Sequence, residues 1–242
     1  EVTKAPLVVT AESASRAYKA ADPAFTARIA GFVNNETDAV LHGQPTFTPT
    51  ASADSPVGSY LIKPSLGSLN AENYVFLFAD GVLTVIPAVG QVSLGNLTQT
   101  FDGRIKAVSA TTVPAGLSVN LTYGGSANPP VNIGSYLVEA TVNDPNYTGS
   151  ASGTLVINKA TLVLTWANPA DITYGTALTG TQLNATASVA GSFNYSPAAG
   201  TVLNAGSNQQ LTVTFTPADT ANYTSTTKTV TLNVAKAAPV VT

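Results

Sequence analysis

Apolar and polar residues alternate with a period of two residues in short stretches along the chain. The pattern is plainest in residues 211–215 and 230–234, which read LTVTF and VTLNV. Successive side chains of a β-strand point to opposite faces of its sheet, so this alternation is typical of strands with one buried face. No long window has the 3.6-residue period of a helix. The chain is therefore predicted to be all-β.

Turn-forming residues separate these stretches at intervals of roughly ten residues. We expect turns at Asp80-Gly81, Asp102-Gly103, Gly124-Gly125 and Asp144-Pro145. In such turns glycine accepts a positive φ and aspartate bonds its own backbone. Many short strands at this spacing favour a β-sandwich over a barrel.

Three short markers recur at a period of about 75 residues. An Asn-Tyr pair stands at 73-74, 146-147 and 222-223, and a Gly-Ser pair stands upstream of it at 58-59, 134-135 and 206-207. A Lys-Ala pair opens stretches at 4-5, 159-160 and 236-237. Recurrence at one period is the signature of an array of similar units.

Tyrosines recur within these markers and in a Tyr-Gly pair, and we predict a structural role for each of them. The tyrosine of the Asn-Tyr pair is expected either to cap a crossover by bonding the backbone, as a tyrosine corner does, or to be a core aromatic. The tyrosines of this predicted structural motif are Tyr60, Tyr74, Tyr136, Tyr147, Tyr174 and Tyr223.

The markers divide the chain into domains at residues 1–87, 88–159 and 160–236, with residues 237–242 as the start of a further repeat. The linkers at 86–88 and 158–160 are too short for free tumbling. We expect a semi-rigid array that continues beyond residue 242 in a longer protein.

Two parts of the chain resemble known families. Residues 166–234, with Tyr174-Gly175 and Asn222-Tyr223, resemble a bacterial immunoglobulin-like repeat. Residues 4–86, with Tyr18 and Asn73-Tyr74, resemble the MBG domain, although the family usually has Tyr-Gly where this chain has Tyr18-Lys19. The middle unit, 88–159, is interpreted as MBG-like from its register. The resemblance implies three tandem immunoglobulin-like β-sandwich domains in an elongated array, and a place in large extracellular bacterial proteins.

Composition excludes several classes of protein. Only 10% of the residues are charged and the net charge is -3, which leaves no positive field for nucleic acid. The chain has no cysteine, so disulfides and thiolate metal sites are excluded. No apolar stretch reaches the roughly 18 residues that span a bilayer, so no membrane insertion is expected.

Catalytic chemistry has little support in the sequence. His42 is the single histidine, stands beside Gly43 and is interpreted as a turn residue. No Gly-x-Ser-x-Gly nucleophile elbow is present. Acid–base or metal catalysis needs several ionisable groups together, and here they are scattered. We expect no enzyme activity, no catalytic residues, no cofactor and no metal.

Weaker alternatives remain for three groups of residues. Isolated aspartates, above all Asp22 and Asp171, offer oxygen ligands for calcium, but turn and cap roles are favoured. Trp166 with Tyr174 and Tyr195 offers a sugar-stacking platform, but burial of Trp166 in the core is favoured. A Lys-Asn isopeptide bond with a carboxylate between them is the least favoured, and its candidate residues are Lys106, Glu139 and Asn158.

The leading hypothesis is a structural spacer or stalk in a bacterial secreted or cell-surface protein, with neighbouring repeats of the same protein as its partners. One alternative is an adhesin module that binds a surface glycan or a protein through its loops. Another is a filament subunit, in which the strand at residues 7–9 or 240–241 completes the sheet of a neighbouring molecule.

Overall fold

The structure of the chain is a computed structural model that describes residues 2–239. Its first repeat consists of two sheets. One sheet has the strand order β3-β1-β6 and the other β2-β7-β5-β4. A single 3-10 turn, η1 (Asp38–Val40), lies between β3 and β4. The strands are β1 (Ala5–Ala11), β2 (Ala14–Ala17), β3 (Ala27–Ala30), β4 (Thr46–Pro49), β5 (Gly58–Ser65), β6 (Tyr74–Ala79) and β7 (Gly81–Ile86).

The second repeat has the same strand order in shorter pieces. Its four-stranded sheet runs β10-β15-β13-β12, and the strand that corresponds to β1 is split into β8, which pairs with β14, and β9, which pairs with β11. The strands are β8 (Ala88–Val89), β9 (Gln91–Gly95), β10 (Thr98–Thr100), β11 (Ser109–Val113), β12 (Val119–Tyr123), β13 (Gly134–Val142), β14 (Tyr147–Thr148) and β15 (Ser150–Asn158).

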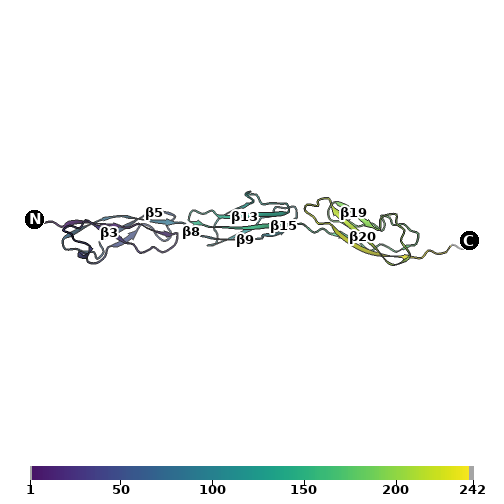
Figure 1. Cartoon of the computed structure of the whole chain (residues 1–242), viewed down its shortest axis with the longest axis horizontal. Helices are drawn as coiled ribbons and strands as arrows, with labels where there is room; N and C mark the ends of the chain where they lie inside the picture. The colour runs from purple at the N-terminus through teal and green to yellow at the C-terminus, as the bar shows by residue number, and fades with distance from the viewer. Residues whose placement is uncertain (1, 240–242) are drawn as a thin grey trace. The chain divides into compact units, whose positions relative to one another are not determined.

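The third repeat follows the same plan. Its four-stranded sheet runs β17-β21-β20-β19, β16 pairs with β18, and the strand that corresponds to β6 is reduced to a parallel bridge between Ala160 and Tyr223. The strands are β16 (Leu164–Thr165), β17 (Ile172–Thr173), β18 (Thr186–Ala187), β19 (Gly191–Ser196), β20 (Gly206–Pro217) and β21 (Thr226–Ala235). Figure 1 labels strands of all three repeats. Residues 240–242 of the expected further repeat lie outside the described residues.

The chain divides into two compact units. One comprises Glu1–Gly95, Ser109–Thr122 and Glu139–Ser152, and the other comprises Asn96–Val108, Tyr123–Val138 and Gly153–Thr242. The division passes through the second repeat, because β12, β13 and β15 contribute residues to both units.

The cores confirm the predicted alternation of buried and solvent-facing positions. Along β20 the side chains of Leu211, Val213 and Phe215 are fully buried, and along β21 every second residue from Val230 to Val234 is buried. Residues of both sheets meet in one cluster in the first repeat, where Ala11 of β1 packs with Ile62 of β5. Two sheets that face one another across a shared core form a β-sandwich. The all-β, tandem immunoglobulin-like sandwich prediction is confirmed.

The expected turn at Asp80-Gly81 is instead a crossover between sheets. β6 pairs with β1 in one sheet, whereas β7, which begins at Gly81, pairs with β5 in the other. A Cβ on Gly81 would lie 2.6 Å from the carbonyl oxygen of Ala11. Glycine is therefore required by a close backbone approach rather than by a positive φ.

The turn after β2 carries a lysine in a conformation that favours glycine. Lys19 has φ 62°, and the N–H of Ala20 bonds the carbonyl of Ala17 at 3.1 Å. The corresponding turn after β17 has Gly175 at the same position, with φ 96°. This position needs a positive φ, which explains why the family prefers glycine after the tyrosine.

Replacing Lys19 with glycine is expected to stabilise the first repeat by about 1 kcal/mol, because a left-handed lysine is strained. The ion pair that Lys19 makes with Asp54 is exposed and 3.9 Å long, so its loss costs little. Lys19→Ala is the control, since it removes the same charge but keeps the strain. Slower amide exchange in β2 and β7, measured by mass spectrometry, is expected for Lys19→Gly alone. Equal exchange in the two variants would contradict it.

Candidate functional site at the junctions between repeats

Each Asn-Tyr pair is tied by its backbone to the start of its own repeat. An alanine N–H at the first strand donates to the asparagine carbonyl, and the same alanine pairs in parallel register with the tyrosine. The N···O distances are 3.0 Å for Ala5 and Asn73, 2.9 Å for Ala88 and Asn146, and 2.9 Å for Ala160 and Asn222. Each pair therefore lies where the chain enters its repeat, and the pairs of the second and third repeats contact the repeat before them.

In the first junction, the asparagine side chain bonds the preceding repeat. The backbone N–H of Val57 donates to Oδ1 of Asn146 at 2.9 Å. Asn146 is oriented by Asp144, whose Oδ1 accepts the Asn146 N–H at 2.8 Å. All three residues belong to the first compact unit.

The second junction repeats this contact inside the second unit. The N–H of Ile133 donates to Oδ1 of Asn222 at 3.4 Å, across the same sequence separation of 89 residues as in the first junction. Asp219 accepts from both the side-chain amide of Asn222, at 2.9 Å, and its backbone N–H, at 3.0 Å. These bonds hold the pKa of Asp219 below its usual value, and the nearby Lys159 contributes in the same direction. The carboxylate thus stays an acceptor that fixes Asn222.

An aromatic pair accompanies each of these hydrogen bonds. The ring of Tyr147 meets that of Tyr18 edge-on, with centroids 5.5 Å apart, and Tyr223 meets Phe101 in the same way at 5.7 Å. Edge-to-face aromatic pairs contribute about 0.5–1.5 kcal/mol beyond the area that they bury.

In each aromatic pair, the ring that belongs to the preceding repeat, Tyr18 or Phe101, lies beside the end of that repeat. The N–H of Tyr18 donates to the carbonyl of Ile86, the last residue of β7, and that of Phe101 donates to Asn158, the last residue of β15. The ring is thus held where the chain leaves one repeat for the next.

In the first two repeats, the tyrosine that follows the Gly-Ser pair makes the backbone hydrogen bond that was expected of the Asn-Tyr tyrosine. The hydroxyl of Tyr60 donates to the carbonyl of Pro56 at 2.8 Å, and that of Tyr136 donates to Asn132 at 3.0 Å. Each bond reaches four residues back and closes the turn that presents the N–H of Val57 or Ile133. This geometry is that of a tyrosine corner.

Tyr74 differs from the other two tyrosines of the Asn-Tyr pairs. Its ring is buried against Phe32, and its hydroxyl bonds the Val33 backbone and the Glu36 carboxylate. The bond with Glu36, together with burial, raises the pKa of Tyr74. The first repeat therefore keeps its tyrosine inside its own core.

Tyr174 of the third repeat occupies the place of Tyr18 and Phe101. Its N–H donates to the carbonyl of Ala235, the last residue of β21, at 2.8 Å. Its side chain is 52% exposed, whereas Tyr18 and Phe101 are half-buried.

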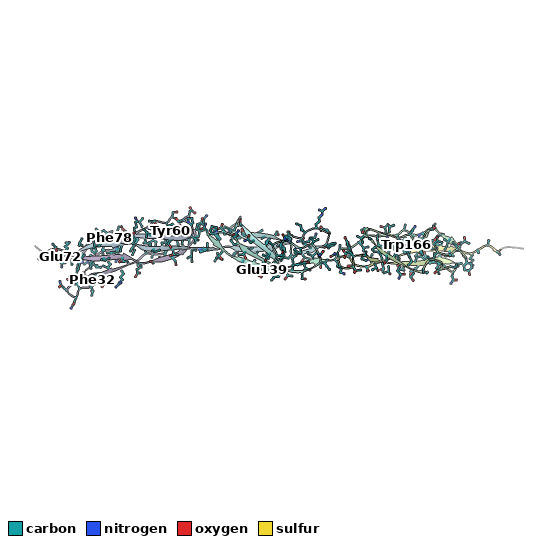
Figure 2. All side chains as sticks on the ribbon, turned by 90° about the horizontal axis from the view of Figure 1, so that it is seen from above. Phe32, Tyr60, Glu72, Phe78, Glu139 and Trp166 are labelled. Carbon is teal, nitrogen blue, oxygen red and sulfur yellow. The ribbon has the colours of Figure 1, made fainter. Side chains whose placement is uncertain are left out.

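Trp166 is a core residue, as favoured from the sequence. It is 3% exposed, donates from Nε1 to the carbonyl of Gln182 at 3.0 Å and meets Tyr195 edge-on. Its position in the third repeat is labelled in Figure 2. No face of its indole ring is left open for a sugar, so the platform with Tyr174 and Tyr195 is not formed.

The calcium candidates already have protein partners. Oδ1 of Asp22 accepts from Nε of Arg16 at 2.6 Å, and Oδ1 of Asp171 accepts from the N–H of Asn233 at 2.9 Å. The bonds from Asn233 lower the pKa of Asp171. Within residues 2–239 no group of three or more acidic, histidine or cysteine side chains is placed to hold a metal ion.

The isopeptide candidates lie in unsuitable surroundings. Glu139 and Asn158 are exposed, and the ammonium of Lys106 pairs with Asp102 at 2.7 Å. Formation of the bond needs a buried carboxylate, which Glu139 is not. His42 is also exposed, and its backbone exchanges two hydrogen bonds with Asn70.

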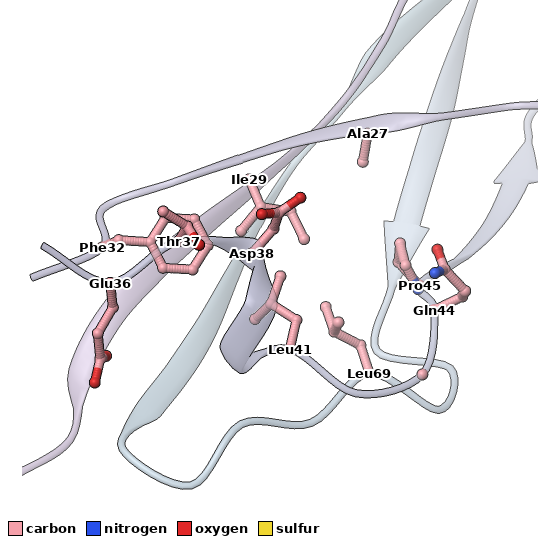
Figure 3. A pocket seen from close by; sticks show the side chains of 11 residues that line it. Ala27, Ile29, Phe32, Glu36, Thr37, Asp38, Leu41, Gln44, Pro45 and Leu69 are labelled. Carbon is pink, nitrogen blue, oxygen red and sulfur yellow. The ribbon is translucent and has the colours of Figure 1, made fainter.

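A cavity of about 530 Å³ opens in the first repeat beside η1. Ile29, Leu41 and Leu69 line its interior, while Glu36 lies to one side (Figure 3). Within residues 2–239 a 3-10 turn such as η1 is found in the first repeat alone, so the part of the cavity that η1 lines belongs to that repeat.

Strand donation by residues 7–9 does not fit this fold. β1 is the central strand of its sheet and pairs with β3 on one side and β6 on the other. Residues 240–241, the second candidate donor, lie outside the described residues. No helix within residues 2–239 is long and apolar enough to cross a bilayer.

Two family models match the chain in tandem. Residues 7–84 match the MBG domain of the YGX type, and residues 90–161 match the MBG domain. The chain therefore belongs, over these two segments, to the MBG domain family. Tandem MBG and immunoglobulin-like domains are repeat modules of a structural or adhesive type, and such domains are typically non-catalytic. No curated protein matches the chain.

Several solved structures resemble the chain weakly. Sidekick-1 immunoglobulin domains 1-5 are 12% identical over 77% of this chain and 46% of that one, with a TM-score of 0.29. The protocadherin GammaB4 extracellular domain is 12% identical over 96% and 49%, with a TM-score of 0.23. The endo-fucoidan hydrolase MfFcnA4 from glycoside hydrolase family 107 is 15% identical over 82% and 38%, with a TM-score of 0.22. The chain spans less than half of each, and likenesses this low transfer no function to it.

Proposed function

We propose that this chain is a non-enzymatic spacer of a bacterial secreted or cell-surface protein, in which Asn-Tyr junctions stiffen the connection between successive repeats. The observation that carries the proposal is the recurrence of one hydrogen bond and one aromatic pair in both junctions. The linkers support it as well, because only Pro87 separates β7 from β8. A linker of one residue leaves little room for independent motion.

Removing the asparagine side chain of the first junction is expected to loosen it. A single hydrogen bond of this kind contributes about 0.5–1.5 kcal/mol, enough to widen the range of relative positions. Spin labels at Lys63→Cys and Glu139→Cys would report the distance across this junction, and the absence of other cysteines makes the labelling clean. We expect a narrow distance distribution in the parent and a broader one in Asn146→Ala.

Two further variants make this experiment specific. Asn146→Asp keeps an acceptor oxygen and is expected to keep the parent distribution. Asn120→Ala removes an exposed asparagine of β12, away from the junction, and is expected to change nothing. A parent distribution as broad as that of Asn146→Ala would rule out a stiffened connection.

A second candidate function, adhesion, is favoured by the cavity beside η1. Its lining combines apolar side chains, such as Ile29 and Leu41, with the polar groups of Asp38 and Gln44, and this mixture suits a sugar, which has both an apolar face and hydroxyl groups. Retention of the chain on an immobilised glycan, lost when Leu41 is replaced by arginine, would support a binding role for the first repeat.

A further inference from the structure

The third repeat carries the half of a junction that contacts the Asn-Tyr pair of a following repeat. In the first two repeats this half consists of an aromatic ring after β2 or β10 and a backbone N–H directly before the Gly-Ser pair. The counterparts in the third repeat are Tyr174 and the N–H of Ala205, which precedes Gly206-Ser207. Tyr174 is anchored to the end of β21 by the same backbone bond that anchors Tyr18 and Phe101.

This surface is open in the described chain. Tyr174 is 52% exposed and Ala205 is exposed. A cavity of about 300 Å³ lies between β20 and β21 at this end, lined in part by Asp171, Ala205, Ala235 and Lys236. Lys236 follows the last strand as Lys159 does in the second junction, where the Lys159 ammonium donates to the carbonyl of Thr220.

At this surface of the third repeat, a different set of hydrogen bonds takes the place of the tyrosine corner. β20 has a register shift between Gly206 and Gln209, and no tyrosine follows Gly206-Ser207. The N–H of Asn208 donates to Oδ1 of Asn233, and the side-chain amide of Asn233 donates to Asp171. These hydrogen bonds therefore hold the turn that contains Ala205 against β21 in the chain without a bound partner.

We propose that this surface binds the Asn-Tyr end of another repeat of the same kind. The partner's asparagine Oδ1 accepts the N–H of Ala205, and its tyrosine ring meets Tyr174 edge-on. The inference rests on the proposed spacer function, because it extends the two observed junctions to a third. Asn146 and Asn222 are already engaged and Tyr74 is buried in its own repeat, so the partner is a repeat other than these three.

The experiment uses the chain extended after Lys236 by a copy of residues 160–236. Amide exchange measured by NMR is expected to slow by roughly fivefold or more at Ala205, since a net hydrogen bond is formed there. Two variants should each restore the exchange rate of the unextended chain: Tyr174→Ala, and replacement by alanine of the residue in the added copy that corresponds to Asn222. Tyr174→Phe keeps the ring and is the matched control.

Unchanged exchange at Ala205 in the extended chain would overturn the proposal, as would slow exchange that survives loss of the added asparagine. The amides of Val57 and Ile133 report the existing junctions in the same spectra. If they lose protection on Asn146→Ala and Asn222→Ala while Ala205 never gains it, docking at Tyr174 fails and the spacer function stands. If they never depend on those asparagines, the spacer function fails.

Discussion

Truncating Phe215 to alanine is expected to destabilise the third repeat by about 3–5 kcal/mol. The Phe215 side chain is fully buried, and its ring lies 4.8 Å from that of Phe193. A close-packed core relaxes only partly around a deleted ring, so the cavity adds to the lost burial. Unfolding in urea can be followed by fluorescence, because Trp166 is the single tryptophan and lies in the core of this repeat.

Phe193 supplies the matched control for this measurement. Phe193 is 37% exposed, so Phe193→Ala removes a ring of the same size from a partly exposed position. A clearly smaller loss of stability is expected there, and Phe215→Leu is expected to lose less than Phe215→Ala. Equal losses for the two alanine variants would contradict the burial argument.

Replacing Asp22 with alanine is expected to destabilise the first repeat by about 3 kcal/mol, because it leaves a buried charge without a counter-ion. The side chain of Arg16 is 2% exposed and bonds Asp22 at 2.6 Å. Its remaining donors reach the carbonyls of Ser52 and Ala17. The loss is placed at the low end of the usual range since Asp22 is 34% exposed and water replaces part of its contribution.

Arg16→Met is the informative comparison for this pair. It removes the charge that needs a partner and keeps an apolar side chain of similar length, so it is expected to cost less than Asp22→Ala. Amide exchange of β2 and β7 by mass spectrometry measures both variants in the full chain. A greater loss for Arg16→Met would mean that the guanidinium contacts with Ser52 and Ala17 outweigh the ion pair.

Periodicity predicted the strands best where a sheet has one buried face. β20 and β21 follow the alternation residue by residue, and the phase of Trp166 predicted its burial. The prediction of a turn at Asp80-Gly81 was wrong because turn-forming residues show where a strand ends but not which sheet the next strand joins. That choice depends on the approach of Gly81 to Ala11, which lies far away in the sequence.

The junctions were visible in the sequence only as a recurrence. The Asn-Tyr pairs stood out by their period, but nothing local to Asn146 indicates that its partner is a backbone N–H 89 residues upstream. The available signal was the apolar residue before each of the first two Gly-Ser pairs, Val57 and Ile133, which keeps step with the asparagine. Because a backbone N–H donor does not depend on the identity of its side chain, the sequence alone could not identify the partner of the asparagine.

In each repeat a strand near the start of the repeat runs parallel to its last strand: β2 beside β7, β10 beside β15 and β17 beside β21. A tension that pulls the two ends of a repeat apart acts along these strands rather than across them. The interstrand hydrogen bonds are then loaded in shear and must rupture together, whereas bonds loaded across the strands open one after another. From this strand order we expect each repeat to resist a pull on its two ends, although the chain has no cysteine with which to form a disulfide.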